Sequence, residues 1–282
     1  MRLVWKVLKR RPSRLVGVAF LLLFTLMAIF GNLIYSHALN VDPNNIYAAP
    51  SWKHILGTDY AGRDVWEQIV RGSTNVLWVA ALAACFTMAL GTIIGLAAGY
   101  LGRVVDAILM RITDLFLTIP SVALLLILAV TLGMSNMVVL ALLLSLTSWG
   151  GLARAIRSMV LSFRERSFVE VSRGLGLGRW HILLHDILPN LMPFVWTHLM
   201  LAITGAIYGE VGLFFLGVVP FKANNWGVMM NFATGSSGAM YSTQSFMFLA
   251  APILAIVLLQ TGIVLCVDAV NELADPRLRS SH

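Results

Sequence analysis

Six long apolar stretches constrain this chain more than any other feature of its sequence. An α-helix needs about 20 mostly apolar residues to cross the hydrocarbon core of a bilayer. Hydrophobic residues make up 59% of the 282 residues and charged residues only 12%, whereas soluble domains carry about 25% charged residues. The sequence therefore predicts an all-α, polytopic membrane protein. Its six transmembrane helices are expected at Leu15–Tyr35, Asn75–Tyr100, Val104–Leu132, Met137–Leu161, Pro189–Val219 and Phe246–Val267.

The positions of Lys and Arg predict how the chain is oriented. Of the 20 Lys and Arg residues, all but Lys53, Arg63, Arg71 and Lys222 fall on one side of the expected spans. Positive charge concentrates on the cytoplasmic side of membrane proteins, so both termini and the connection at 162–188 are expected in the cytoplasm of a multi-pass protein of the cell inner membrane. The net charge of +7 is then a topology signal, and no nucleic-acid partner is expected.

These patterns divide the chain into five parts. Segment 1–14 is a basic cytoplasmic segment, and 15–35 is a first helix too long for a cleaved signal peptide. Segment 36–74 is external with an interfacial helix, 75–267 is a five-helix core that contains the cytoplasmic connection, and 268–282 is a cytoplasmic tail. Segment 220–245 is also external. Cys85 and Cys266 lie inside apolar runs, so no disulfide framework is expected.

The stretch "FVEVSRGLGLGRWHILLHDILPN" (Phe168–Asn190) is charged and glycine-rich, although it lies between two apolar stretches. Its glycines do not form a nucleotide-binding loop, because no strand precedes them and the chain has no G-x-x-x-x-G-K-[ST] motif. The pattern favours two short helices, near Arg164–Arg173 and Gly178–Ile187, with a glycine break between them. From the residues alone, this pair suits a partner's groove or a lipid surface equally well.

The same stretch resembles the E-A-A-x-x-x-G-x(9)-x-L-P motif of the membrane subunits of binding-protein-dependent ABC importers. Glu170 matches the acidic position, Gly176 the glycine and Leu188-Pro189 the terminal pair, while Val171 and Ser172 stand in the two small positions. Gly174 lies between Ser172 and Gly176, in the same glycine break. The resemblance implies that this cytoplasmic helix pair docks on a separate ATP-binding subunit and couples ATP hydrolysis to the membrane helices.

A second stretch narrows the resemblance to one subfamily. "HILGTDYAGRDVWEQIVRGS" (His54–Ser73) is similar to a signature of the second permease subunit of dipeptide and oligopeptide importers. Glu67-Gln68 stands where that signature usually has Ser-Arg. "EVGLFFLG" (Glu210–Gly217), "WGVMM" (Trp226–Met230) and "DPRLR" (Asp275–Arg279) are similar too, so the resemblance spans nearly the whole chain.

The resemblance implies a transport subunit and not an enzyme, one that forms half of a pore for short peptides. Its implied partners are a second homologous permease subunit, two ATP-binding subunits, an external substrate-binding protein and membrane lipid. ATP and Mg²⁺ would bind the partner subunits, so no catalytic residue, cofactor or metal is expected here. The same machinery could import oligosaccharides, nickel chelates or glutathione-like compounds. An alternative of another class is an ion-coupled secondary transporter or a channel, but the sequence has one mid-membrane acid and no matched pair of broken helices.

Some residues have two readings that the sequence leaves open. Glu210, inside the fifth stretch, either lines the translocation path or joins two helices through a hydrogen bond, because a lone charge facing lipid is costly. Trp149, followed by Gly150, either packs helices together or lies near a gate. The external Asp59, Arg63 and Asp64 either contact a partner or gate, or form a local salt-bridged cap.

Three further expectations concern local structure. Arg111 and Asp114 are three residues apart and are expected to form an ion pair on one helical face. Pro120 should kink the third span. His181 and His185 are expected on solvated faces and not at a zinc site, because no H-E-x-x-H motif is present and no cysteine is near them.

Overall fold

The computed structural model describes residues 11–35, 37, 39–132, 136–219, 224–235 and 245–274. Within these ranges the chain is helical, apart from loops and one isolated β-bridge between Thr58 and Asp64. Most of the basic segment 1–14, parts of the external loop 220–245, and the tail sequence "DPRLR" lie outside the described residues. The expected all-α class is confirmed.

Five helices in the described part of the chain are long and apolar enough to cross a membrane. They are α2 (Pro12–Ile34), α3 (Val65–Leu101), α6 (Met137–Phe163), α9 (Leu188–Phe215) and α11 (Phe246–Ala274). The expected third span consists of two helices, α4 (Arg103–Thr118) and α5 (Ser121–Leu132), and it makes a sixth span if the pair is counted as one. The short elements are η1 (Pro43–Asn45), α7 (Ser167–Gly174), α8 (Arg179–His181), η2 (Ile182–Ile187) and α10 (Trp226–Gly235).

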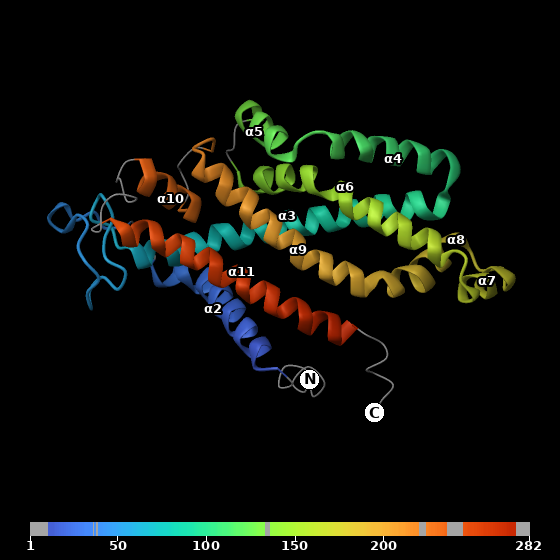
Figure 1. The fold of residues 1–282 in the computed structure, drawn as a ribbon, viewed down its shortest axis with the longest axis horizontal. Helices are drawn as coiled ribbons and strands as arrows, with labels where there is room; N and C mark the ends of the chain where they lie inside the picture. Colours follow the sequence, from blue (N-terminus) through green and yellow to red (C-terminus); the bar gives the residue numbers. More distant parts are fainter. Residues whose placement is uncertain are drawn as a thin grey trace.

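The third span is broken rather than kinked. α4 and α5 meet at an angle of 86°, and Ile119 between them has an extended backbone (φ −79°, ψ 128°). A proline disfavours the helical conformation of the residue before it, so Pro120 ends α4 at Thr118. Figure 1 shows the two pieces of this span along one side of α6.

The contact between α3 and α6 is the most extensive in the fold. Along α3, Gly91, Gly95 and Gly99 recur every fourth residue and therefore lie on one helix face. A Cβ at Gly91 would come within 2.7 Å of Leu152, and one at Gly99 within 2.7 Å of Val160. Small residues let helix backbones approach closely in membranes, and α3 and α6 run side by side through the middle of the molecule (Figure 1).

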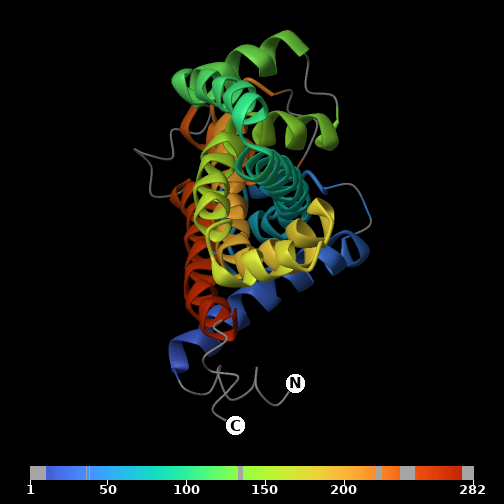
Figure 2. The same cartoon turned by 90° about the vertical axis from the view of Figure 1, so that its right-hand side faces the viewer.

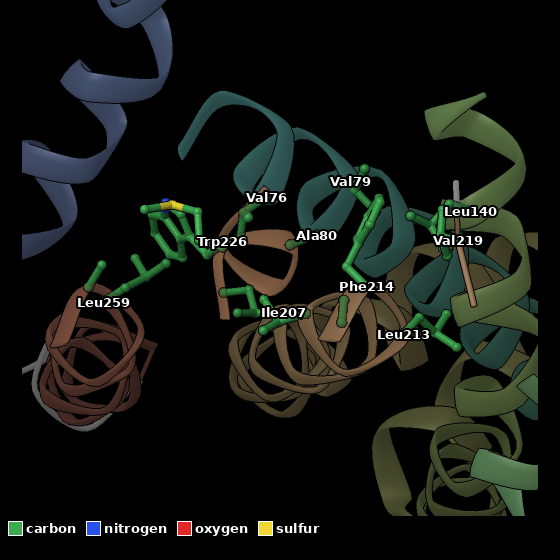
Figure 3. Close-up of a cluster of buried hydrophobic side chains, with 14 of the residues drawn as sticks. Val76, Val79, Ala80, Leu140, Ile207, Leu213, Phe214, Val219, Trp226 and Leu259 are labelled. Atoms are coloured by element: carbon green, nitrogen blue, oxygen red, sulfur yellow. The ribbon is translucent and has the colours of Figure 1, made fainter. Parts of the chain in front are cut away.

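Two clusters of buried apolar side chains hold the helices together. The larger core cluster joins α3, α9, α10 and α11, and Figure 3 shows Val76, Ile207 and Trp226 gathered between these helices. The indole Nε1 of Trp226 donates a hydrogen bond of 3.0 Å to the carbonyl of Ile69. The smaller core cluster joins α3, α6 and the connection before α9.

The first and last helices pack against each other along the edge of this core (Figures 1 and 2). A Cβ at Gly17 of α2 would come within 2.6 Å of Leu265 of α11. Arg14 and Glu272 form an ion pair of 2.5 Å between the two helices. The two ends of the described chain are therefore held close together.

The glycine contact between α3 and α6 generates the first prediction. A Cβ at Gly95 would come within 2.6 Å of the carbonyl oxygen of Ala153, which cannot move without shifting α6. We expect Gly95→Ala to destabilise the chain by about 1–3 kcal/mol through overpacking. Gly151→Ala is the matched control, because a Cβ there would meet no described atom within 4 Å. Thermal unfolding in detergent measures both, and equal melting temperatures would contradict the close contact.

Candidate functional site

The α7 helix lies at one end of the molecule, beyond the ends of α3 and α6 (right in Figure 1, front in Figure 2). Val169 is completely buried and Ser172 is buried on the same helix face. The apolar side chains of Val171 and Leu175 point outward and are 61% and 74% exposed. Trp180, in the following α8, is 71% exposed. The segment thus has a buried inner face and an exposed outer face that is also apolar.

The glycine break ends α7 in a Schellman motif. The N–H of Leu177 donates to the carbonyl of Ser172 at 3.1 Å, and that of Gly176 to Arg173 at 3.0 Å. This pattern places one residue in the left-handed conformation, which glycine adopts without a Cβ penalty. Gly176 is that residue, with φ +75°, whereas Gly174 is an ordinary residue of the helix. The motif-matching glycine therefore has a defined backbone role.

The expected second short helix does not exist as a separate element. α8 runs into the π-helix η2 and then into α9, so Arg179–Phe215 is one continuous helix. Pro189 lies in the first turn of α9, where it lacks an N–H and its ring would clash with the carbonyl four residues earlier. A π-turn widens the helix locally, and η2 lies directly before Leu188-Pro189. The terminal pair of the motif thus marks an irregular joint.

The inner face of this segment is fused to the membrane helices. Val169 and Ile187 are completely buried, and Ile182 is nearly so. They belong to the smaller core cluster together with Leu96 of α3 and Ile156 of α6. Fully burying an aliphatic side chain contributes about 1.5–3 kcal/mol, so these contacts hold the segment against the membrane-spanning helices.

Glu170, His181 and His185 of the segment face solvent. Glu170 is exposed and has no ion-pair partner among the described residues. The rings of His181 and His185 stack with centroids 4.5 Å apart, and both residues are exposed. Nowhere in the described ranges do three His, Cys, Asp or Glu residues come together as metal ligands would.

At the other end of the molecule, Asp59, Arg63 and Asp64 form a local cap. Asp59 is completely buried and accepts hydrogen bonds from Arg63 Nε at 2.7 Å and Gln68 Nε2 at 3.0 Å. Asp64 caps α3 by accepting from the N–H of Glu67 at 2.9 Å and lies 2.8 Å from Nδ1 of His54. Of the two readings left open by the sequence, this geometry fits the local cap.

Sequence reasoning missed two features of this region. Gln68, which replaces the usual Arg of the signature, is a direct partner of Asp59. α3 also starts at Val65, about ten residues before Asn75, the expected start of the second span. In the described part of 36–64, the structure has η1 as its one helical element, and the helical residues of 65–74 are the first turns of α3.

Glu210 joins α9 to the start of α10. It is completely buried, and its Oε1 accepts a hydrogen bond of 2.6 Å from the side-chain amide of Asn225. The Oδ1 of Asn225 in turn accepts from the N–H of Gly227 at 2.8 Å. Of the two readings left open for Glu210, this geometry fits the one in which it holds two helices together.

Trp149 packs between α6 and α4. It is buried and meets Phe116 edge-on, with ring centroids 5.4 Å apart, and a Cβ at Gly150 would come within 3.1 Å of Leu117. This geometry fits the packing reading. α4 and α6 are also joined by ion pairs that the sequence did not indicate.

The expected Arg111–Asp114 ion pair is wrong. Asp114 pairs with Arg154 at 2.6 Å, and Asp106 pairs with Arg157. Both pairs connect α4 to α6, and Arg157 lies 51 residues from its partner. A rule for neighbours on one helix could not find them, because the antiparallel contact of two helices creates them.

Two family models match this chain. Residues 91–280 match the model described as binding-protein-dependent transport system inner membrane component. Residues 1–50 match the model described as N-terminal TM domain of oligopeptide transport permease C. The first match covers well over half of the chain, including α7, η2 and the α3–α6 contact.

Curated relatives and a solved structure agree with these matches. The chain is 39% identical over 258 residues to a putative peptide permease protein of Brucella suis, which covers 88% of this chain and 83% of the relative. It is 30% identical to the probable D,D-dipeptide transport system permease protein DdpC of Escherichia coli, over 98% and 91% of the two chains. An inward-facing structure of the MetNI methionine ABC transporter has a similar fold, with a TM-score of 0.60 at 18% identity over 74% of this chain and 96% of that chain.

The Schellman motif generates the second prediction. We expect Gly176→Ala to cost about 1–2 kcal/mol, because it forces a Cβ into the left-handed conformation. Gly174→Ala is the control in the same segment, and it should be neutral or slightly stabilising because alanine favours helix. Limited proteolysis of the purified chain should cut near 174–178 faster in the first variant alone. Equal cleavage of both variants would contradict the assigned geometry.

The Glu210–Asn225 hydrogen bond generates the third. Glu210→Leu leaves the buried Asn225 amide without its acceptor, which should destabilise the chain by about 1–3 kcal/mol. Glu210→Gln keeps an acceptor oxygen in the same place and should melt close to wild type. Thermal unfolding in detergent separates the two, and a Gln variant as unstable as the Leu variant would show that the carboxylate itself is needed.

Proposed function

Because the chain belongs to the family of binding-protein-dependent transport system inner membrane components, and is thus a membrane permease subunit, we propose that its α7–η2 segment is the surface on which an ATP-binding partner subunit docks. The observation that carries this proposal is that the segment has a buried apolar face and an exposed apolar face. Val169 and Ile187 anchor it inside, while Val171, Leu175 and Trp180 are exposed outside. Exposed apolar side chains gathered beyond the membrane-spanning helices are suited to a partner protein.

The buried inner face explains how a docked partner would move the spans. A force on α7 acts through Val169 and Ile182 on Leu96 of α3 and Ile156 of α6. Packed interiors deform little, so such contacts pass motion between elements as rigid bodies. The α3–α6 pair then shifts as a unit, and one packed arrangement of spans gives way to another.

The proposed complex contains several chains. A second homologous permease subunit supplies the other half of the pore, and two ATP-binding subunits carry ATP with its Mg²⁺. An external binding protein delivers the cargo. In this arrangement both termini and the α7–η2 segment are cytoplasmic, as the distribution of Lys and Arg favours, and this chain performs no chemistry of its own.

The proposed cargo is a short peptide. Support comes from the relatives, which are named as peptide, dipeptide and D,D-dipeptide permeases. The direct test is the affinity of the cognate external binding protein for short peptides against oligosaccharides of similar size. Peptide binding supports the proposal, and selective oligosaccharide binding overturns the cargo assignment while leaving the permease function in place.

A pair of valines in one helix tests the docking proposal. Val171→Asp places a charge on the exposed outer face, so we expect normal amounts of folded protein in the membrane but at least about tenfold slower uptake, because a docking contact of more than 1.4 kcal/mol is lost. Val169→Asp buries the same charge in the smaller core cluster and should instead abolish folding. Normal uptake by Val171→Asp would remove the docking assignment.

Dependence on ATP separates this function from the ion-coupled alternative. Uptake of labelled peptide into cells should stop when the ATP-binding subunits are deleted, even with the ion gradients intact. The measurement is initial uptake rate with and without those subunits, and with an uncoupler as control. Uptake that persists without them and stops with the uncoupler would favour a secondary transporter.

A further inference from the structure

A cavity of about 390 Å³ lies where the last turn of α3 meets the α7–η2 segment. Three arginines line it, Arg164, Arg173 and Arg179. The other lining residues carry no formal charge. They are Tyr100, Leu101, Gly176, Leu177 and Ile182. The cavity therefore collects three positive charges without a carboxylate in its wall.

Two of these arginines have no counter-charge within the described chain. Arg164 donates through Nη1 to the carbonyl of Gly99 at 3.0 Å and so completes the end of α3. Arg173 and Arg179 are exposed, and the ion pairs of the described residues do not include them. Like charges gathered in a concave site repel each other and raise the local positive potential. An anion in the cavity would relieve that repulsion.

The charged groups point to an oxyanion of the phosphate type. Guanidinium groups present several N–H donors in a planar fork, which matches the geometry of phosphate and carboxylate oxygens. The exposed Arg173 and Arg179 are free to supply such donors, whereas Arg164 is already bonded to the backbone. A ligand here would therefore be held by charge-assisted hydrogen bonds from two chain segments on either side of Gly176.

The surroundings favour a lipid as the source of that phosphate. The cavity opens at the end of the membrane-spanning α3, and the wall includes the exposed Leu101 and Leu177 as well as Tyr100. The chain then continues into α4 with the exposed apolar Val104 and Val105. Basic pockets between transmembrane helices on the cytoplasmic side bind anionic lipid head groups. A free anion would gain nothing from these apolar neighbours.

We propose that this cavity binds the phosphate of an anionic phospholipid. Such a lipid would connect the end of α3 to α7 and η2, and so would stiffen the joint on which the docked partner acts. Placement in the cytoplasmic leaflet rests on the orientation proposed above, but binding itself does not.

The test uses the purified full chain in neutral detergent, titrated with phosphatidylglycerol and, separately, with zwitterionic phosphatidylcholine. Native mass spectrometry counts the bound lipid. The cavity variant is Arg173→Gln with Arg179→Gln. The matched control is Arg111→Gln with Arg166→Gln, which removes the same charge from residues outside the cavity lining. Melting temperatures of both variants check that each is folded.

We expect the cavity variant to bind phosphatidylglycerol about tenfold or more weakly, because each basic residue near an anionic lipid contributes favourably to binding. The control should stay within about twofold of wild type, and phosphatidylcholine should not bind at the site. Wild-type binding by the cavity variant would overturn the proposal, as would an equal loss in the control.

Two further outcomes would assign the cavity to another ligand and so overturn the lipid proposal. If phosphatidylglycerol fails to bind the wild-type chain, while inorganic phosphate binds the wild-type chain and not the cavity variant, the site holds a free anion. If the cavity variant keeps its lipid but no longer co-purifies with the ATP-binding subunits, the arginines contact protein. Lipid binding is measured without transport, so failure of this proposal and failure of the docking proposal are distinguishable.

Discussion

The close approach of α3 and α6 is the contact on which the rest of the structure depends. Without a Cβ at Gly91, Gly95 and Gly99, the two helices interlock against Leu152 and Val160. In lipid this packing replaces the hydrophobic drive that joins helices in water, because lipid tails are as apolar as the side chains. The smaller core cluster forms where this pair ends, and it is there that the α7–η2 segment is anchored.

That anchoring explains why a family defined by transport carries a charged, glycine-rich connection. In the proposed function, the segment needs one face that packs on the membrane helices and another that would contact the ATP-binding partner. Val169 and Val171, two residues apart on α7, fall on these opposite faces. The left-handed Gly176 turns the chain after α7, and the π-turn before Pro189 continues it into α9. The arginine-lined cavity lies between the segment and the end of α3.

Some predictions from the sequence were accurate because their cause is local or compositional. The apolar stretches indicated the helical class and the approximate spans, and the glycines indicated the break after α7, where Gly176 is left-handed. Other predictions were wrong because tertiary contacts decide them. Asp114 pairs with Arg154 of α6 and not with its neighbour Arg111. The second short helix is continuous with α9, since nothing in residues 178–188 ends it. The sequence left two interpretations open for Glu210 and for Asp59. Choosing between them required the positions of their hydrogen-bond partners, Asn225 and Gln68.

By itself, the sequence determined that this chain is a polytopic helical membrane protein, because about 20 apolar residues in a row have one stable solution in a bilayer. Its motifs likewise pointed to the family and to the α7–η2 segment. Only the tertiary structure decided which face of that segment is buried, which acids pair with which arginines, and that Arg164, Arg173 and Arg179 surround one cavity. These features arise where helices distant in sequence come together, and no rule of local spacing contains that information.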